Sequence, residues 1–234
     1  MRQLLFLSIA LIGLSFAVKK PTYTYLAIGD GYTKGLGVLP EERWTNLIEQ
    51  KFESKKIKFE LAGNLADSAY TIKTAIKNHI GDLQAKQANV VSIMLGATEV
   101  TQNMSLEAFE ADYVKLLTLT LAQVPSHNSI LLITIPDFTA VPLGKQLTRG
   151  FDAHQKIKDF NRIIIRLAKE RNIRVFDIFQ ASDQLGKIDK LLASNGIYPS
   201  KYGHEAWAKM LFPEFEHIIS IPLHKDLKKK YKSH

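Results

Sequence analysis

The chain of 234 residues contains no cysteine. A disulfide, a thiol nucleophile and a cysteine-ligated metal centre are therefore excluded. Its seven histidines are scattered and never show the spacing that places two imidazoles on one face of a helix. The glycine-rich patterns that hold nucleotide phosphates are also missing. We therefore expect neither a cofactor nor a bound metal.

No apolar run is long enough to cross a bilayer comfortably. The longest, LLFLSIALIGLSFA after Met1-Arg2-Gln3, has the length of a signal-peptide apolar region. Ser15 and Ala17 are small residues at the positions that a signal peptidase requires, which predicts cleavage after Ala17. The protein is then exported, either periplasmic or secreted. An uncleaved membrane anchor is the alternative, and the length of the run disfavours it.

The C-terminal segment, residues 223–234, has a single acidic residue and no arginine. It carries five lysines within a chain of net charge +8, namely Lys225, Lys228, Lys229, Lys230 and Lys232. Such a tail suits contact with anionic lipid or a cell-wall polymer, or it is a solvated terminus. The missing arginines and the single aromatic residue weigh against nucleic acid, so we expect no nucleic-acid partner.

Between these ends, strand-like apolar runs alternate with helix-like segments, without a linker or a repeat. The expected strands are 23–29, 56–63, 89–96, 129–136 and 173–179; the expected helices are 40–52, 71–86, 105–123, 152–171 and one from Lys201. This alternation is typical of parallel sheets covered on both faces. It predicts one domain over residues 18–222, an α/β fold built as a three-layer α/β/α sandwich around about five mostly parallel strands.

In such folds the functional site lies beyond the carboxyl ends of the strands. This rule gathers five turns around one crevice: 29–33, 63–71, 96–101, 136–139 and 195–198. Four stretches in and around these turns are informative together: AIGDGYTKGLG (27–37), GNLADSAYT (63–71), IMLGATEV (93–100) and ASNGIYPSKYGHEAWA (193–208). In order and spacing they resemble the four blocks of the SGNH/GDSL hydrolases. The resemblance covers nearly the whole chain after the leader, and it implies a flavodoxin-like sandwich and ester-hydrolase or acyltransferase chemistry.

The resemblance fails at each residue on which that chemistry depends. Gly31 stands at the position of the nucleophilic serine, and Ala69 and Thr98 stand at those of the oxyanion-binding glycine and asparagine. Asn195 and Tyr198 replace the aspartate and histidine of the last block. Glycine offers no oxygen for an acyl-enzyme, and a phenol with a reference pKa near 10 is a poor base at neutral pH. The sequence therefore predicts a pseudoenzyme.

Part of the oxyanion site remains in principle. The backbone N–H groups of residues 31 and 69 survive these substitutions, and Thr98 retains a hydroxyl donor. Ala69 is the uncertain position of this turn. A glycine there often adopts a positive φ, which an alanine side chain disfavours. We expect the crevice to bind an acylated glycan, a cell-wall fragment, a lipid or a protein partner.

Two alternatives stay open. One is a divergent hydrolase that uses Asp30, Ser68 or Glu99, with His204 as a possible base for Ser68. Against it, we expect Asp30 to cap its turn, Ser68 to cap the following helix and His204 to pack at a helix start. Asp152 and His154 likewise indicate a solvated helix start. The other alternative is an envelope-surface binding protein that acts through the lysine-rich tail.

Overall fold

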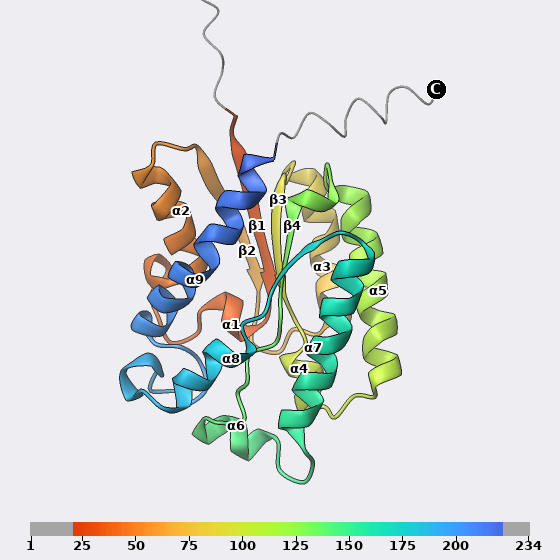
Figure 1. The fold of residues 1–234 in the computed structure, drawn as a ribbon, viewed down its shortest axis with the longest axis vertical. Helices are drawn as coiled ribbons and strands as arrows, with labels where there is room; N and C mark the ends of the chain where they lie inside the picture. The colour runs from red at the N-terminus through yellow and green to blue at the C-terminus, as the bar shows by residue number, and fades with distance from the viewer. Residues whose placement is uncertain (1–20, 222–234) are drawn as a thin grey trace, which may run out of the picture.

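The computed structural model describes residues 21–221. Its centre is a parallel five-stranded sheet of order β2-β1-β3-β4-β5 (Figure 1). The strands are β1 (Tyr23–Gly29), β2 (Phe59–Ala66), β3 (Val90–Met94), β4 (Ile130–Ile133) and β5 (Arg174–Phe176). The predicted sheet is thus confirmed. The predicted leader, residues 1–17, and the predicted tail, residues 223–234, lie outside the described residues.

Helices cover both faces of this sheet (Figure 1). On one face α2 (Trp44–Ser54) lies against α9 (Lys201–Ser220), and on the other α3 (Ile72–Ala85), α5 (Leu106–Gln123) and α7 (Ala153–Glu170) lie side by side. The three-layer sandwich is therefore confirmed. Within residues 21–221, no helix has the length and apolar character needed to span a bilayer.

The core follows from side-chain periodicity. Along α7, Ile157, Phe160 and Ile164 recur at helical spacing and are fully buried. Phe160 stacks on Phe109 of α5, with ring centroids 3.8 Å apart. The strands β1, β3 and β4 are buried along almost their whole length, as expected for a sheet covered on both faces.

Several predicted bounds shift; β4 and β5, for example, end at Ile133 and Phe176, three residues before the ends of the predicted strands 129–136 and 173–179. The expected helix 40–52 divides into a 3₁₀ turn, η1 (Pro40–Glu42), and α2, because Arg43 between them has extended backbone angles. The Glu42 carboxylate accepts from the Leu39 N–H at 3.0 Å and closes the first turn locally. The expected strand 56–63 begins at Phe59 instead, because Lys56 adopts φ 58° in the connection that follows α2.

Short helices were not predicted. They are α1 (Gly31–Lys34), α4 (Ala97–Thr101), α6 (Pro142–Leu147) and α8 (Phe179–Ser182), accompanied by the 3₁₀ turns η2 (His127–Ser129), η3 (Asp183–Gly186) and η4 (Asp189–Leu191). Each is too short to display an apolar period in the sequence. Several lie at the carboxyl ends of the strands, where they shape the site.

Candidate functional site

A crevice of about 170 Å³ opens beyond the carboxyl ends of β1 and β3. Each of the five predicted turns contributes to it, and α6 adds a wall. Its lining residues are Asp30, Gly31, Tyr32, Ser68, Ala69, Ala97, Thr98, Thr101, Phe138, Leu147, Ile197 and Tyr198. The order of the strands reverses between β1 and β3, and open α/β sheets bind ligands at such a point.

The first turn presents position 31 to this crevice. The Asp30 side chain caps α1 by accepting from the Tyr32 N–H at 3.1 Å. Its carbonyl oxygen accepts from the N–H groups of Thr33 and Lys34 at 3.0 and 2.8 Å. Gly35 then closes the turn with φ 70°. The expected capping role of Asp30 is confirmed.

Asp30 is also a titratable group at the edge of the crevice. The residue is only 3% exposed, and burial raises the pKa of its carboxyl to about 7. The negative charge of Glu99 adds to this shift, whereas hydrogen bonds from backbone N–H groups oppose it. Near neutral pH the crevice therefore holds a carboxyl divided between its protonated and ionised forms.

The Tyr198 side chain occupies the space that a side chain at position 31 would need. A Cβ added to Gly31 would lie 2.5 Å from Tyr198 Cε1 and closer still to Cζ and Oη. The Tyr198 ring meets Tyr32 edge to face, with centroids 5.0 Å apart. Burial, assisted by the charge of Asp30, raises the pKa of Tyr198 to about 12. At neutral pH the phenol is protonated and is available as a hydrogen-bond donor.

Asn195 supports the turn that carries Tyr198. Its Oδ1 accepts from the N–H groups of Ile197 and Tyr198 at 3.2 and 3.0 Å. Its Nδ2 donates to the carbonyl oxygen of Leu36 at 3.2 Å. The amide thereby ties the last block to the loop after α1. A carboxylate would retain the two accepted bonds and lose the donated one.

The two remaining oxyanion positions face the crevice. Within residues 21–221, the non-glycine residues with positive φ are Lys56, Gln87, Asn103 and Asn172, so Ala69 accommodates its Cβ without backbone strain. Thr98 lies in the first turn of α4 after Gly96, whose φ of 133° requires glycine. The residues that carry the expected N–H and hydroxyl donors thus line one cavity.

Glu99 does not belong to the crevice, contrary to the expectation. Its side chain is fully buried, and its Oε1 accepts from the Ile72 N–H at 2.7 Å, at the start of α3. Burial raises its pKa. Because Thr98 and Glu99 are successive residues of one helical turn, they point in different directions, and only Thr98 reaches the cavity.

Ser68 lines the crevice but is not a helix cap. The side chain of Thr71 caps α3, accepting from the Thr74 N–H at 3.1 Å, which corrects the predicted role of Ser68. The Ser68 N–H and hydroxyl both bond the carboxylate of Asp67, at 2.7 and 3.4 Å. Among residues 21–221, no imidazole forms a hydrogen bond with the exposed hydroxyl.

His204 is a packing residue, as predicted. It is fully buried on α9, and its Nδ1 accepts from the Trp44 N–H at 3.3 Å. Burial, together with the charge of Arg43, lowers its pKa to about 4, so the imidazole is neutral. The structure therefore does not pair Ser68 with His204.

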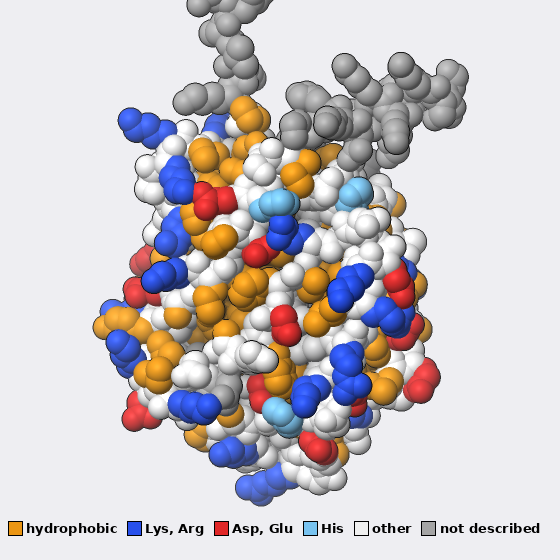
Figure 2. Space-filling model, viewed as in Figure 1, with side chains coloured by type: hydrophobic (Ala, Val, Ile, Leu, Met, Phe, Trp, Pro, Cys, Tyr) orange, Lys and Arg blue, Asp and Glu red, His pale blue; other side chains and the backbone are white. Residues whose placement is uncertain are grey.

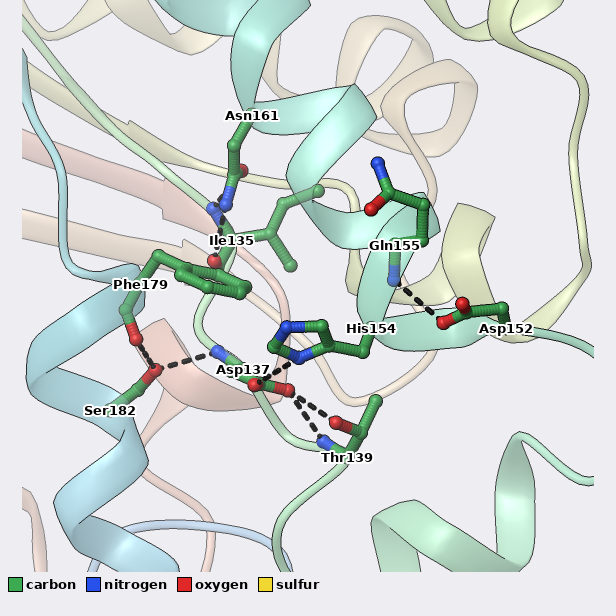
Figure 3. A network of polar contacts seen from close by, with 9 residues as sticks. All are labelled: Ile135, Asp137, Thr139, Asp152, His154, Gln155, Asn161, Phe179 and Ser182. Atoms are coloured by element: carbon green, nitrogen blue, oxygen red, sulfur yellow. Dashed lines mark hydrogen bonds and ion pairs between the residues drawn. The ribbon is translucent and has the colours of Figure 1, made fainter.

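One acid–histidine pair is not apparent from the sequence (Figure 3). Asp137, at the end of the segment after β4, contacts His154 Nδ1 through Oδ2 at 2.7 Å. Its Oδ1 accepts from the N–H and hydroxyl of Thr139 at 3.0 and 2.6 Å. The Asp137 side chain is 7% exposed and that of His154 is 52% exposed. Asp152, the expected neighbour of His154, instead caps α7 by accepting from the Gln155 N–H at 2.9 Å.

The comparisons with known proteins agree with this geometry. The model of the GDSL-like Lipase/Acylhydrolase family matches residues 27–206. The chain belongs to this family. No curated protein matches the chain.

Among solved structures, TesA shares 16% identity at a TM-score of 0.67, over 83% of this chain and 99% of that chain. The esterase EstA from Pseudoalteromonas sp. shares 18% sequence identity at a TM-score of 0.66, and the match covers 85% of this chain and 99% of EstA. A variant of Axe2, an acetyl xylan esterase from Geobacillus stearothermophilus, shares 20% sequence identity at a TM-score of 0.64. The match covers 83% of this chain and 95% of that chain. At these identities the likeness shows the GDSL hydrolase fold.

The packing of Tyr198 against position 31 leads to a stability prediction. Gly31→Ala is expected to destabilise the native protein by about 1–3 kcal/mol, because its methyl group displaces the phenol. In a Tyr198→Ala background the same change is expected to be neutral or stabilising, since the space is vacant. Urea unfolding of the four proteins gives the coupling energy.

Gly81→Ala is the matched control. Gly81 lies in α3, and a Cβ there would meet no atom within 4 Å. It should stabilise both backgrounds equally, by up to about 1 kcal/mol. Additive effects of Gly31→Ala and Tyr198→Ala would contradict the packing described.

Proposed function

We propose that this chain is an exported, catalytically inactive member of the family that binds a ligand with a short acyl group in the crevice. The position of the Tyr198 phenol carries the proposal. It fills the space that a nucleophile at position 31 would use. It also replaces the base with a group that is protonated at neutral pH, because burial raises its pKa to about 12.

The donors in the crevice support binding of a carbonyl group. Thr98 and Tyr198 offer hydroxyl groups, and positions 31 and 69 supply backbone N–H groups beside the same cavity. Phe138, Leu147 and Ile197 form apolar walls. A site with few polar groups and apolar walls is typical of small-ligand pockets.

The size of the crevice favours a short acyl group over a long lipid chain. About 170 Å³ suits an acetyl group together with part of the sugar that carries it. One structural relative is described as an acetyl xylan esterase, which supports an acylated glycan by analogy. An acetylated cell-wall fragment presents the same chemistry. The proposed ligand is therefore an acetylated glycan that remains intact after binding.

Titration with acetylated xylooligosaccharides and with tetra-N-acetylchitotetraose tests this proposal. The expected result is saturable binding by calorimetry without release of acetate. Ala69→Phe, which fills the exposed rim of the crevice, should weaken binding at least tenfold. Ala111→Phe, at an exposed position on α5, is the matched control and should bind like the parent. Acetate release, or equal affinity in both variants, would refute the proposal.

One observation favours a second candidate, a hydrolase that uses His154. Its imidazole is half exposed and is oriented by a buried carboxylate, which is the arrangement of a general base. If the parent releases acetate, His154→Ala should abolish the reaction and His127→Ala should not. Loss of activity in Ser68→Ala instead would point to the serine beside Asp67.

A further inference from the structure

We propose that the end of the molecule opposite the crevice docks on an anionic lipid bilayer. This surface, the strand-start pole, comprises the beginning of β1, the segment after α2 and the end of α9. The proposal is independent of any ligand in the crevice. It rests on the distribution of charge, on the positions of the two ends of the described chain, and on a hollow between them.

The excess positive charge belongs almost entirely to the two ends of the chain. The whole sequence has 31 Lys and Arg against 23 Asp and Glu. Residues 21–221 contain 23 of these cations and 22 of the acids, and are therefore nearly neutral. The remaining residues hold the other eight cations and a single acid. After cleavage behind Ala17, seven of the eight cations remain: Lys19, Lys20 and the five lysines of the tail.

These two segments join the fold at neighbouring points. The Tyr23 hydroxyl, at the start of β1, donates to the carbonyl oxygen of Ile219, near the end of α9, at 2.9 Å. Figure 1 shows the described chain beginning and ending at the same end of the sheet. The two basic segments are therefore attached side by side at the strand-start pole.

The strand-start pole itself combines cations with apolar surface. A hollow of about 450 Å³ is lined by Lys55, Lys56, Lys58, Tyr23, Ile57 and Ile219, together with other residues. Lys55 pairs with Glu216, whereas Lys56 and Lys58 are exposed and form no ion pair within residues 21–221. Figure 2 shows Lys and Arg side chains and apolar side chains at this end of the described body.

This combination selects a lipid surface. Clusters of four to eight basic residues beside a membrane-binding element are typical of anionic lipid recognition. Partly exposed apolar side chains that line the hollow, Ile57 and Ile219, gain by entering the interfacial region, which a hydrated cell-wall polyanion does not provide. Docking would hold the crevice away from the bilayer. The seven residues of β1 run from Tyr23 to Gly29, a span of about 20 Å.

Vesicle sedimentation tests the proposal with protein purified from an exporting host. Binding is expected to vesicles that contain one quarter phosphatidylglycerol and not to phosphatidylcholine alone. Lys56→Glu/Lys58→Glu should weaken this binding at least tenfold, because two attractions become repulsions. Lys145→Glu/Arg149→Glu, with the same charge change on exposed residues near the crevice end, should weaken it less than threefold.

Each other outcome overturns the inference. Equal losses in the two double variants would indicate a response to net charge alone. Binding to soluble polyphosphate but not to anionic vesicles would make the partner a polymer. If Lys56→Glu/Lys58→Glu binds anionic vesicles as tightly as the parent, the hollow is not part of the surface that contacts the membrane. Ala69→Phe should leave vesicle binding unaltered, which separates this inference from the proposed function of the crevice.

Discussion

The quadruple variant Gly31→Ser/Thr98→Asn/Asn195→Asp/Tyr198→His is expected to be an esterase, whereas Gly31→Ser alone should remain inactive. The fold and the turns that present these positions are in place around one crevice. In the single variant the new Oγ meets the phenol of Tyr198 and no base. In the quadruple variant an imidazole replaces that phenol. The expected gain in kcat/KM for p-nitrophenyl acetate over the parent is at least about 10³-fold.

The control for this gain is the same quadruple variant with alanine in place of serine at position 31. It should show no gain, because it retains every change except the nucleophile. Circular dichroism should show that all variants are folded. Hydrolysis by the parent at a rate comparable with that of the quadruple variant would contradict the proposed inactivity. A folded but inactive quadruple variant would contradict the expected retention of the reactive geometry.

The second large effect is the dependence of stability on pH through Asp30. Burial raises its pKa from 3.8 to about 7 in the folded protein, so between these values the folded state binds more protons than the unfolded state. Its contribution to the free energy of unfolding is therefore present below about pH 4 and is lost as pH rises to about 7. The loss amounts to as much as about 4 kcal/mol.

His204 acts in the opposite sense over a similar range. Burial lowers its pKa from 6.5 to about 4, so it destabilises the fold as pH falls through this window. Glu99, whose pKa burial also raises, acts in the same sense as Asp30, so His204 offsets only part of the slope of the parent. Asp30→Asn retains an acceptor for the Tyr32 N–H and removes the carboxyl titration, so its stability should rise relative to the parent as pH increases from 4 to 7.

Urea unfolding at several pH values measures this difference. Gly81→Ala, which alters no titratable group, is the control and should run parallel to the parent. If Asp30→Asn also runs parallel to the parent between pH 4 and 7, the carboxyl does not titrate as described. The difference between variant and parent isolates Asp30, because the opposing contribution of His204 is common to both and cancels.

The fold was predictable because its strands are long buried runs. β1 coincides with its predicted range, and α5 and α7 begin one residue after Ser105 and Asp152, which cap them. The start of β2 was displaced because the left-handed conformation of Lys56 is not encoded by an apolar period. Short helices such as α4 were missed for the same reason. Local sequence thus determined the layers better than the connections between them.

The site was predictable as a set of turns but not as a set of contacts. The sequence places Gly31 and Tyr198 in the same crevice, yet only packing shows that one fills the space of the other. Its place after Thr98 in the sequence predicts Glu99 in the crevice, although the turn of α4 directs it toward Ile72. The pairing of Asp137 with His154 joins a loop to a distant helix start. Such contacts depend on tertiary structure, which no local pattern reports.

The fit between Gly31 and Tyr198 also constrains how this protein can evolve. A serine that appears first at position 31 collides with the phenol and has no base to activate it. A histidine that appears first at position 198 opens a vacancy beside a glycine that has no oxygen. Neither first step assembles the family's serine and histidine together, and the first one carries a packing cost. Under the proposed inactivity, the loss of the family reaction would be entrenched, because single substitutions would not lead back to it and selection would act on the proposed binding function instead.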